Sequence, residues 1–142
     1  MRIRATIIGK ITDLVEAVPS VKAVYPYPEE KLETYPCAVF FEDSFDNNTE
    51  TNEENLQSLK YLMYVVVGTT EKDKSTAFKT ILPNAVDDII SEINENWDAG
   101  LIDGQIVQLM VSGGKVYHRP FQGGLEAIQE INITVKLLTN NS

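Results

Sequence analysis

The sequence predicts an α+β domain in which a mostly antiparallel sheet of about five strands carries two main helices. Two segments have apolar residues at helical spacing, whereas the segments between and after them have continuous or alternating apolar residues, as strands do. In chain order the elements are a helix, three strands, a helix and two strands, which favours helices gathered on an antiparallel sheet. The length of 142 residues fits one domain, 1–142, and 43% hydrophobic residues supply a core.

The N-terminal helix is predicted from apolar residues three and four positions apart, at Ile3, Ile7, Ile11, Leu14 or Val15, and Val18. Pro19 ends this helix, because proline disfavours helical geometry in the residue before it. A short β-branched run at 21–25 predicts the first strand. Prolines punctuate the next segment, 26–36, which we therefore expect to be a loop.

Two apolar runs predict a hairpin in the middle of the chain. Residues 37–41 form a continuous apolar run, typical of a strand that is covered on both faces. Residues 59–67 are apolar on both faces, so we place this strand centrally in the sheet. The segment 42–56 between them is polar and acidic, and we expect an exposed loop there.

The second helix is predicted to begin near Ser75, a suitable N-cap, and to reach Trp97. Pro83 lies inside the helical pattern and has no N–H to donate to the carbonyl of Lys79. We therefore expect a kink at this position, or two abutting helices.

The C-terminal third predicts a turn and two strands. The turn covers 98–104 and leads to a strand at 106–111. The last strand, 125–138, alternates apolar and polar residues, as a half-covered strand does. Its phase slips at Ile128–Gln129, which indicates a bulge or a change of environment.

The net charge of −9 is unevenly distributed. Two stretches lack Lys and Arg, one between Lys31 and Lys60 and the other between Lys79 and Lys115. Binding to nucleic-acid phosphates needs clustered cations, so this pattern argues against it. The acidity either keeps the surface soluble or forms a surface to which DNA does not adhere.

We expect neither a membrane span nor a secretory signal. The longest apolar run, 61–67, is much shorter than the roughly 18 residues of a spanning helix. Gly9 and Lys10 interrupt the apolar residues near the N-terminus. Cys37 is the only cysteine, which excludes an intrachain disulfide and fits a reducing cytoplasm.

No catalytic, cofactor-binding or metal site is predicted. One Cys–His dyad is conceivable, between Cys37 and His118, but a thiol within an apolar strand is usually an inert buried group. One histidine and one cysteine do not supply the usual zinc ligands. Neither of the glycine-rich phosphate-binding motifs occurs.

One acidic segment imitates the opening of a calcium-binding loop. Asp46, Asn48 and Glu50 match the first ligands of an EF-hand. The match then fails, because Thr51 stands where the turn needs glycine and Gln57 where a bidentate glutamate is needed. A solvated acidic loop is the simpler interpretation.

The best candidate site is the segment 113–124, in which two glycine pairs flank a stretch rich in cations and aromatic residues. The candidate residues are Lys115, Tyr117, His118, Arg119 and Phe121. One interpretation is an ordinary long hairpin loop whose aromatic side chains fold back onto the sheet. The other is a docking arm hinged at the glycines, since Tyr, Phe and Arg anchor protein interfaces.

The order of these segments resembles the tail terminator (tail-completion) proteins of long-tailed bacteriophages. The segments that carry the resemblance are the opening helix ending at VPSVKAVYPYP, the strand YPCAVFF with its acidic loop, the strand KYLMYVVVG, the helix STAFKTILPNAVDDIISEINENW and the closing strand IQEINITVKLL. The resemblance covers nearly the whole chain and lies in architecture and order, so it assigns no role to an individual residue.

The resemblance implies a structural virion protein without catalytic residues. Such proteins form a ring, typically a hexamer, that caps the finished tail tube, stops its polymerisation and offers a surface for head joining. The implied partners are further copies of the chain, the tail tube protein and a head-closure or connector protein, while DNA passes through the lumen without specific binding. The implied location is the tail or neck of the virion, after assembly in the host cytoplasm.

Three alternatives stay open. The chain is either this terminator or another neck or tail component, such as a head-closure or head–tail joining protein, because small α+β ring proteins share the same physics. A small-ligand-binding regulatory α+β domain is a different class and predicts a monomer or dimer with a pocket. An enzyme is the third class, and the missing catalytic constellations argue against it.

Overall fold

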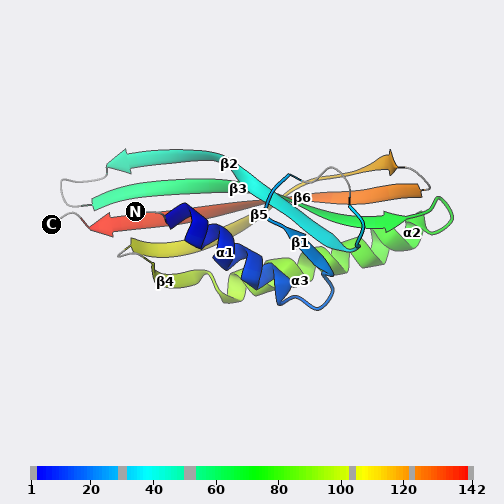
Figure 1. The fold of residues 1–142 in the computed structure, drawn as a ribbon, viewed down its shortest axis with the longest axis horizontal. Helices are drawn as coiled ribbons and strands as arrows, with labels where there is room; N and C mark the ends of the chain where they lie inside the picture. The colour runs from blue at the N-terminus through cyan, green and yellow to red at the C-terminus, as the bar shows by residue number, and fades with distance from the viewer. Residues whose placement is uncertain (1–2, 29–31, 50–53, 103–104, 122–123, 141–142) are drawn as a thin grey trace.

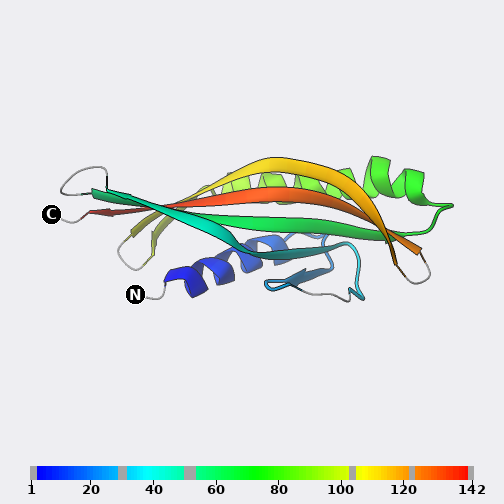
Figure 2. The same cartoon turned by 90° about the horizontal axis from the view of Figure 1, so that it is seen from above.

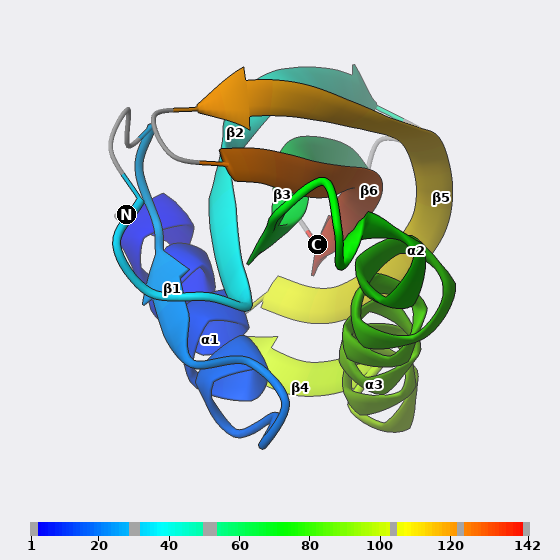
Figure 3. The ribbon, with the colours of Figure 1, turned by 90° about the vertical axis from the view of Figure 1, so that its right-hand side faces the viewer.

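The computed structural model describes residues 3–28, 32–49, 54–102, 105–121 and 124–140. The fold is α+β, as predicted, with a curled six-stranded sheet and two helical segments. Figure 3 shows the two helical segments on the left and right, with strands of the curled sheet above and between them, and both segments contribute to one apolar core.

The strand order is β1-β2-β3-β6-β5-β4, with β1 parallel to β2 and every other pair antiparallel. The strands are β1 (Ala23–Tyr25), β2 (Cys37–Thr49), β3 (Glu54–Thr69), β4 (Asp98–Ile102), β5 (Gln105–Phe121) and β6 (Gly124–Asn140). The prediction that residues 59–67 lie centrally is confirmed, since β3 pairs with β2 on one side and β6 on the other. The sheet is mostly antiparallel, as predicted, but the prediction of about five strands missed β4, which we had expected to be a turn.

The acidic segment 42–56 is largely strand, and the prediction of a loop there was wrong. β2 continues to Thr49 and β3 begins at Glu54, with paired Cα positions from Ser44–Lys60 to Thr49–Asn55. Residues 50–53 lie outside the described part of the chain. A strand at the margin of a sheet is held by main-chain hydrogen bonds and needs no apolar side chains, so its composition did not reveal it.

The glycine-flanked segment 113–124 is also strand, not a loop. β5 continues to Phe121 and β6 begins at Gly124, while residues 122–123 lie outside the described part. The first glycine pair forms a β-bulge, because the register shifts between Gly113 and Val116. A Cβ atom on Gly114 would lie 2.9 Å from Cβ of Glu130, so this close approach requires glycine.

The first helix, α1 (Ile3–Glu16), confirms the predicted apolar spacing. Its buried residues are Ile3, Ile7, Ile11, Leu14 and Val15. They face the sheet and belong to the main core.

The second helical segment changes its hydrogen-bond pattern just before Pro83, where we had expected a kink or two abutting helices. It consists of α2 (Lys74–Thr76), a π-helical turn η1 (Ala77–Ile81) and α3 (Leu82–Glu95). The N–H of Leu82 donates to the carbonyl of Ala77, five residues earlier, and Pro83 then lies in the first turn of α3, where a missing N–H is tolerated. The N-cap is Asp73, not Ser75 as predicted; Ser75 lies within α2.

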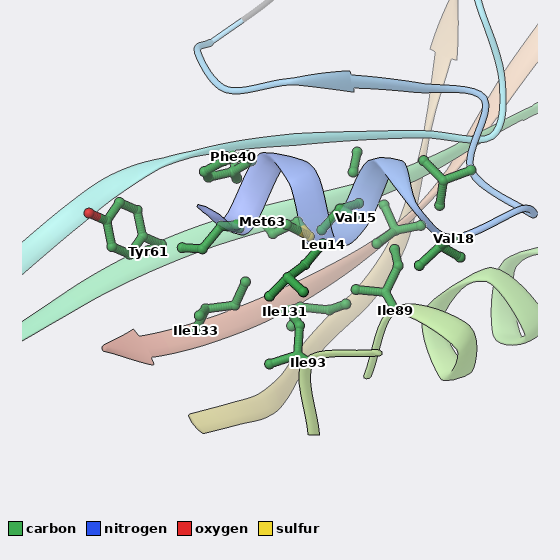
Figure 4. Close-up of a cluster of buried hydrophobic side chains, with 14 of the residues drawn as sticks. Leu14, Val15, Val18, Phe40, Tyr61, Met63, Ile89, Ile93, Ile131 and Ile133 are labelled. Carbon is green, nitrogen blue, oxygen red and sulfur yellow. The ribbon is translucent and has the colours of Figure 1, made fainter. Parts of the chain in front are cut away.

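The main core lies between the helices and one face of the sheet, and Figure 4 shows its centre. Phe40 from β2 packs edge-on against Tyr61 from β3, with ring centroids 6.3 Å apart. Ile89 of α3 and Ile131 of β6 are fully buried in the same cluster. In the part of the chain that the structure describes, none of the helices is long and apolar enough to cross a bilayer.

Candidate docking surface

The face of the sheet opposite the helices carries a second, smaller apolar cluster. Cys37, Val66 and Ile128 form its buried centre, and they lie in one row across β2, β3 and β6. Leu32 and Tyr35, from the segment before β2, pack over this row. Both faces of β6 are therefore covered near Ile128, which explains the predicted change of environment there.

A buried carboxylate, that of Glu126, lies at the edge of this cluster. Glu126 is 3% exposed and stands between Gly68 of β3 and Arg119 of β5 in the sheet register. Arg119 Nε donates to Glu126 Oε1 at 2.5 Å, and the Tyr35 hydroxyl donates to Glu126 Oε2 at 2.5 Å. A charge in an apolar setting needs such partners, and these two hold the segment before β2 against β5.

Gly68 makes room for this arrangement. A Cβ atom at Gly68 would lie 2.7 Å from Cδ2 of the Tyr35 ring, closer than two carbon atoms approach. The glycine therefore lets the tyrosine ring lie flat on β3, where its hydroxyl reaches Glu126.

The protonation of these groups follows from their surroundings. Burial, then the hydrogen bond to Glu126, raises the pKa of Tyr35. The hydrogen bond to Glu126 raises the pKa of Arg119. Burial, helped by the charge of Glu126, raises the pKa of the Cys37 thiol to about 12. At neutral pH Tyr35 is thus a neutral donor, Arg119 a cation and Cys37 a protonated thiol.

A small cavity of about 280 Å³ opens beside the network. Apolar residues line most of it, among them Leu32, Val39 and Phe41. Tyr64, Tyr117 and Arg119 also line it and supply its polar groups. The volume is at the lower limit of small-molecule sites.

All five predicted site residues lie on β5 and are exposed, but they do not form one cluster. Tyr117 and Arg119 face the cavity, and the ring centroid of Phe121 lies 6.1 Å from that of Tyr35. Lys115 lies in the bulge. His118 points to the other face of the sheet, with its ring edge-on to Phe78 at 6.2 Å between centroids.

This arrangement separates the groups of the conceivable nucleophilic dyad. Cys37 belongs to the cluster on the cavity face, whereas His118 contacts Phe78 of the π-helical turn on the helix face. Burial, helped by the charge of Glu126, raises the pKa of the thiol to about 12, so it stays protonated. The Cys–His dyad is therefore not formed.

The structure also does not form the calcium loop that the sequence imitates. Asp46 and Asn48 lie within β2, in an extended ladder with β3 and not in a loop. Glu50 and Thr51 lie outside the described part. Among the described residues there is no group of three or more His, Cys, Asp or Glu side chains that could hold a metal ion.

Sequence reasoning found Arg119 but missed the residues that position it, Glu126, Tyr35 and Gly68. A carboxylate inside the apolar run LEAI is the one signal that pointed to a paired buried charge. Its partners are 7 and 91 residues away, so only the sheet register brings them together.

Comparison with known protein families finds no family model that matches this chain, and comparison with curated proteins finds no match either.

Proposed function

We propose that this chain is a structural subunit that assembles into a ring, caps the tail tube of a long-tailed bacteriophage, stops its polymerisation and offers the head-joining surface. The observation that carries the proposal is the outer half of β5. From Ser112 to Phe121 every residue is exposed, and these residues include cations and large apolar side chains in an otherwise acidic protein.

Three apolar side chains of this segment are exposed to a large extent. Val116 is 54% exposed, Tyr117 37% and Phe121 39%. Aromatic residues and arginine are the types that anchor protein interfaces, and here they are exposed along a single strand. Because the segment is a strand and not a hinged loop, it presents these groups without a large ordering cost.

The proposal gives the surface a specific set of partners. Further copies of the chain would form the ring, typically a hexamer, and its two rims would contact the tail tube protein and a head-closure or connector protein. The negative net charge of the chain suits a ring through which DNA passes without binding.

Light scattering after gel filtration, negative-stain imaging and incubation with purified tail tubes test the proposal. We expect rings in solution or on tube ends, and tubes that no longer elongate. Val116→Asp should abolish assembly, because it places a charge in the interface. Ile81→Asp is the matched control, since Ile81 is 41% exposed but lies on the helical segment.

A chain that stays monomeric at high concentration and leaves tube growth unchanged would overturn the proposal. Binding to head connectors in place of tube ends would assign the chain to another part of the neck.

The cavity favours a second candidate function, the binding of a small ligand. Its apolar walls and the guanidinium of Arg119 suit a small aromatic carboxylate. Benzoate and phenylacetate should then raise the melting temperature of the wild type but not of Tyr117→Ala. A melting temperature that neither compound changes would count against this function.

A further inference from the structure

Two strands of the sheet have free outer edges. β1 pairs with β2 only over Cys37–Val39, so that edge of β2 has no strand beside it from Phe40 onward among the described residues. β4 pairs with β5 only up to Gln108, and the N–H of Leu109 donates to the carbonyl of Trp97, so in the described part of the chain no strand lies beside this edge of β5 from Met110 onward. The main-chain groups of such edges can pair with another strand.

We propose that the free edge of β2 in one copy pairs, antiparallel, with the free edge of β5 in the next copy. In the register that we assign, Asp43 lies opposite Lys115, and residues 40–48 face residues 118–110. This inference rests on the proposed ring, and it names the surfaces through which neighbouring copies join.

The bulges of the two edges select this register. β2 has an extra residue, Asp43, between the pairs Glu42–Tyr61 and Ser44–Lys60. β5 has its own bulge between Gly113 and Val116. A bulge reverses the face of the sheet to which the following side chains point. Residues that face one another across two bulged edges therefore lie on the same face of the sheet, before and after the bulges, only when the two bulges are opposite one another.

The side chains agree with this register before and after the bulges. Phe40 would meet His118, and both lie on the helix-bearing face, one in the main core and the other against Phe78. Phe41 would meet Tyr117, and both line the cavity on the opposite face.

The agreement continues on the other side of the bulges, where Phe45 would meet Gly113. The guanidinium of Arg4, on α1, lies 4.8 Å from the Phe45 ring centroid, which places Phe45 on the helix-bearing face. Gly113 pairs with Ile131, a residue of the main core, and so lies on the same face.

Charge favours pairing between the two different edges over pairing of like edges. β2 carries Glu42, Asp43 and Asp46 on the stretch that is free, whereas the corresponding stretch of β5 carries Lys115 and His118. Glu42 already pairs with Arg4. Asp43 and Lys115 are both exposed, and no ion pair joins either of them to a described residue. A symmetric joint between two β2 edges would place like charges opposite one another.

The register also has the offset that a closed sheet needs. Within one copy, Ser44 lies level with Met110 through Lys60 and Thr134, whereas across the joint it would face Gly114. Each copy is thus displaced along the strand direction by four residues, which is about 13 Å. The four strands β2, β3, β6 and β5 span about 19 Å across the sheet. The ratio of these two lengths corresponds to a strand tilt of about 35°. Closed barrels have tilts of about 35–45°, and Figure 2 shows the strong curvature of β5.

Cysteine cross-linking tests the register. In one chain, positions 43 and 115 lie on β2 and β5, and these two strands are about 14 Å apart because β3 and β6 lie between them. A disulfide between the two positions therefore forms only between copies. Under oxidation, the double variant Asp43→Cys/Lys115→Cys should give a ladder of covalent oligomers. An equal mixture of the two single variants should give dimers, whereas either single variant alone and the wild type should give monomers, because Cys37 is buried.

Efficient dimer formation by Asp43→Cys or Lys115→Cys alone would overturn the inference, because it would show a symmetric joint. A double variant that assembles, in solution or on tail tubes, without forming a ladder would also overturn it, as would a chain that stays monomeric in both settings. A ladder from a protein that does not cap tubes would support the joint and refute the proposed function, whereas capping without a ladder would refute only the joint.

A charge exchange gives an independent measurement at the same two positions. Asp43→Lys and Lys115→Asp should each weaken assembly at least severalfold, and the double variant should restore most of it. Two single variants whose losses persist in the double variant would contradict the assigned contact.

Discussion

Replacing Arg119 by glutamine is expected to destabilise the fold by about 3 kcal/mol, because the buried carboxylate of Glu126 then loses its cation. The side chain of Glu126 is 4% exposed, whereas that of Arg119 is 49% exposed. Removing one partner of a fully buried ion pair costs about 3–5 kcal/mol, and water that reaches the half-exposed guanidinium places this pair at the lower end.

Urea denaturation at neutral pH, followed by circular dichroism, measures this loss. With the slope typical of a small domain, a loss of this size lowers the midpoint by about 1.5 M urea. Lys72→Gln is the control, because it removes an exposed cation that takes part in neither proposal, and it should change the stability by less than about 0.5 kcal/mol.

The double variant Arg119→Gln/Glu126→Gln separates charge burial from simple loss of packing. It should be more stable than Arg119→Gln alone, because it no longer buries an uncompensated charge. A loss below about 1 kcal/mol for Arg119→Gln, as in an exposed surface pair, would refute the reasoning. A double variant less stable than the single one would refute it equally.

Three further predictions concern close packing and buried groups. Gly68→Ala should lower the free energy of unfolding by about 1–3 kcal/mol in the same urea titration, because its Cβ would lie 2.7 Å from the Tyr35 ring. Gly9→Ala is the control, since its Cβ would have nothing within 4 Å, and it should stabilise α1 slightly. Tyr61→Phe should be neutral or stabilising by up to about 1 kcal/mol, since the buried Tyr61 hydroxyl has no partner among the described residues; a loss above that value would reveal one. Burial raises the pKa of Cys37 from 9.0 to about 12, so the folded state holds this proton more tightly than the unfolded state. Its contribution to stability is full below about pH 9 and is lost as the pH rises through about 12, so between about pH 8 and pH 11 the urea midpoint of the wild type should fall further than that of Cys37→Ala.

Apolar spacing in the sequence was enough to predict α1, the second helical segment and the four longer strands in part. These elements bury a stripe or a face, and burial imposes a period of 3.6 or 2 on the apolar residues. A local disturbance of the second helix near Pro83 was predictable for a similar reason, since the missing N–H is a property of one residue, but the π-helical turn that accommodates it was not.

The full length of β2 and β5 and the existence of β4 were not predictable in this way. The outer halves of β2 and β5 are polar or mixed, because they extend beyond the core and are held by main-chain hydrogen bonds, which any residue except proline can make. The glycine pair at 113–114 suggested a hinge, but in the register it forms a bulge against Glu130.

The sequence by itself determined the fold class, the central place of β3 and the position of the exposed basic and aromatic residues, because composition and periodicity record what is buried. Only the tertiary structure decided that His118 faces away from Tyr117 and Arg119, and that Glu126 joins Arg119 to Tyr35. Which residues share a face depends on strand register, and register is set by bulges and by pairing between segments far apart in the chain.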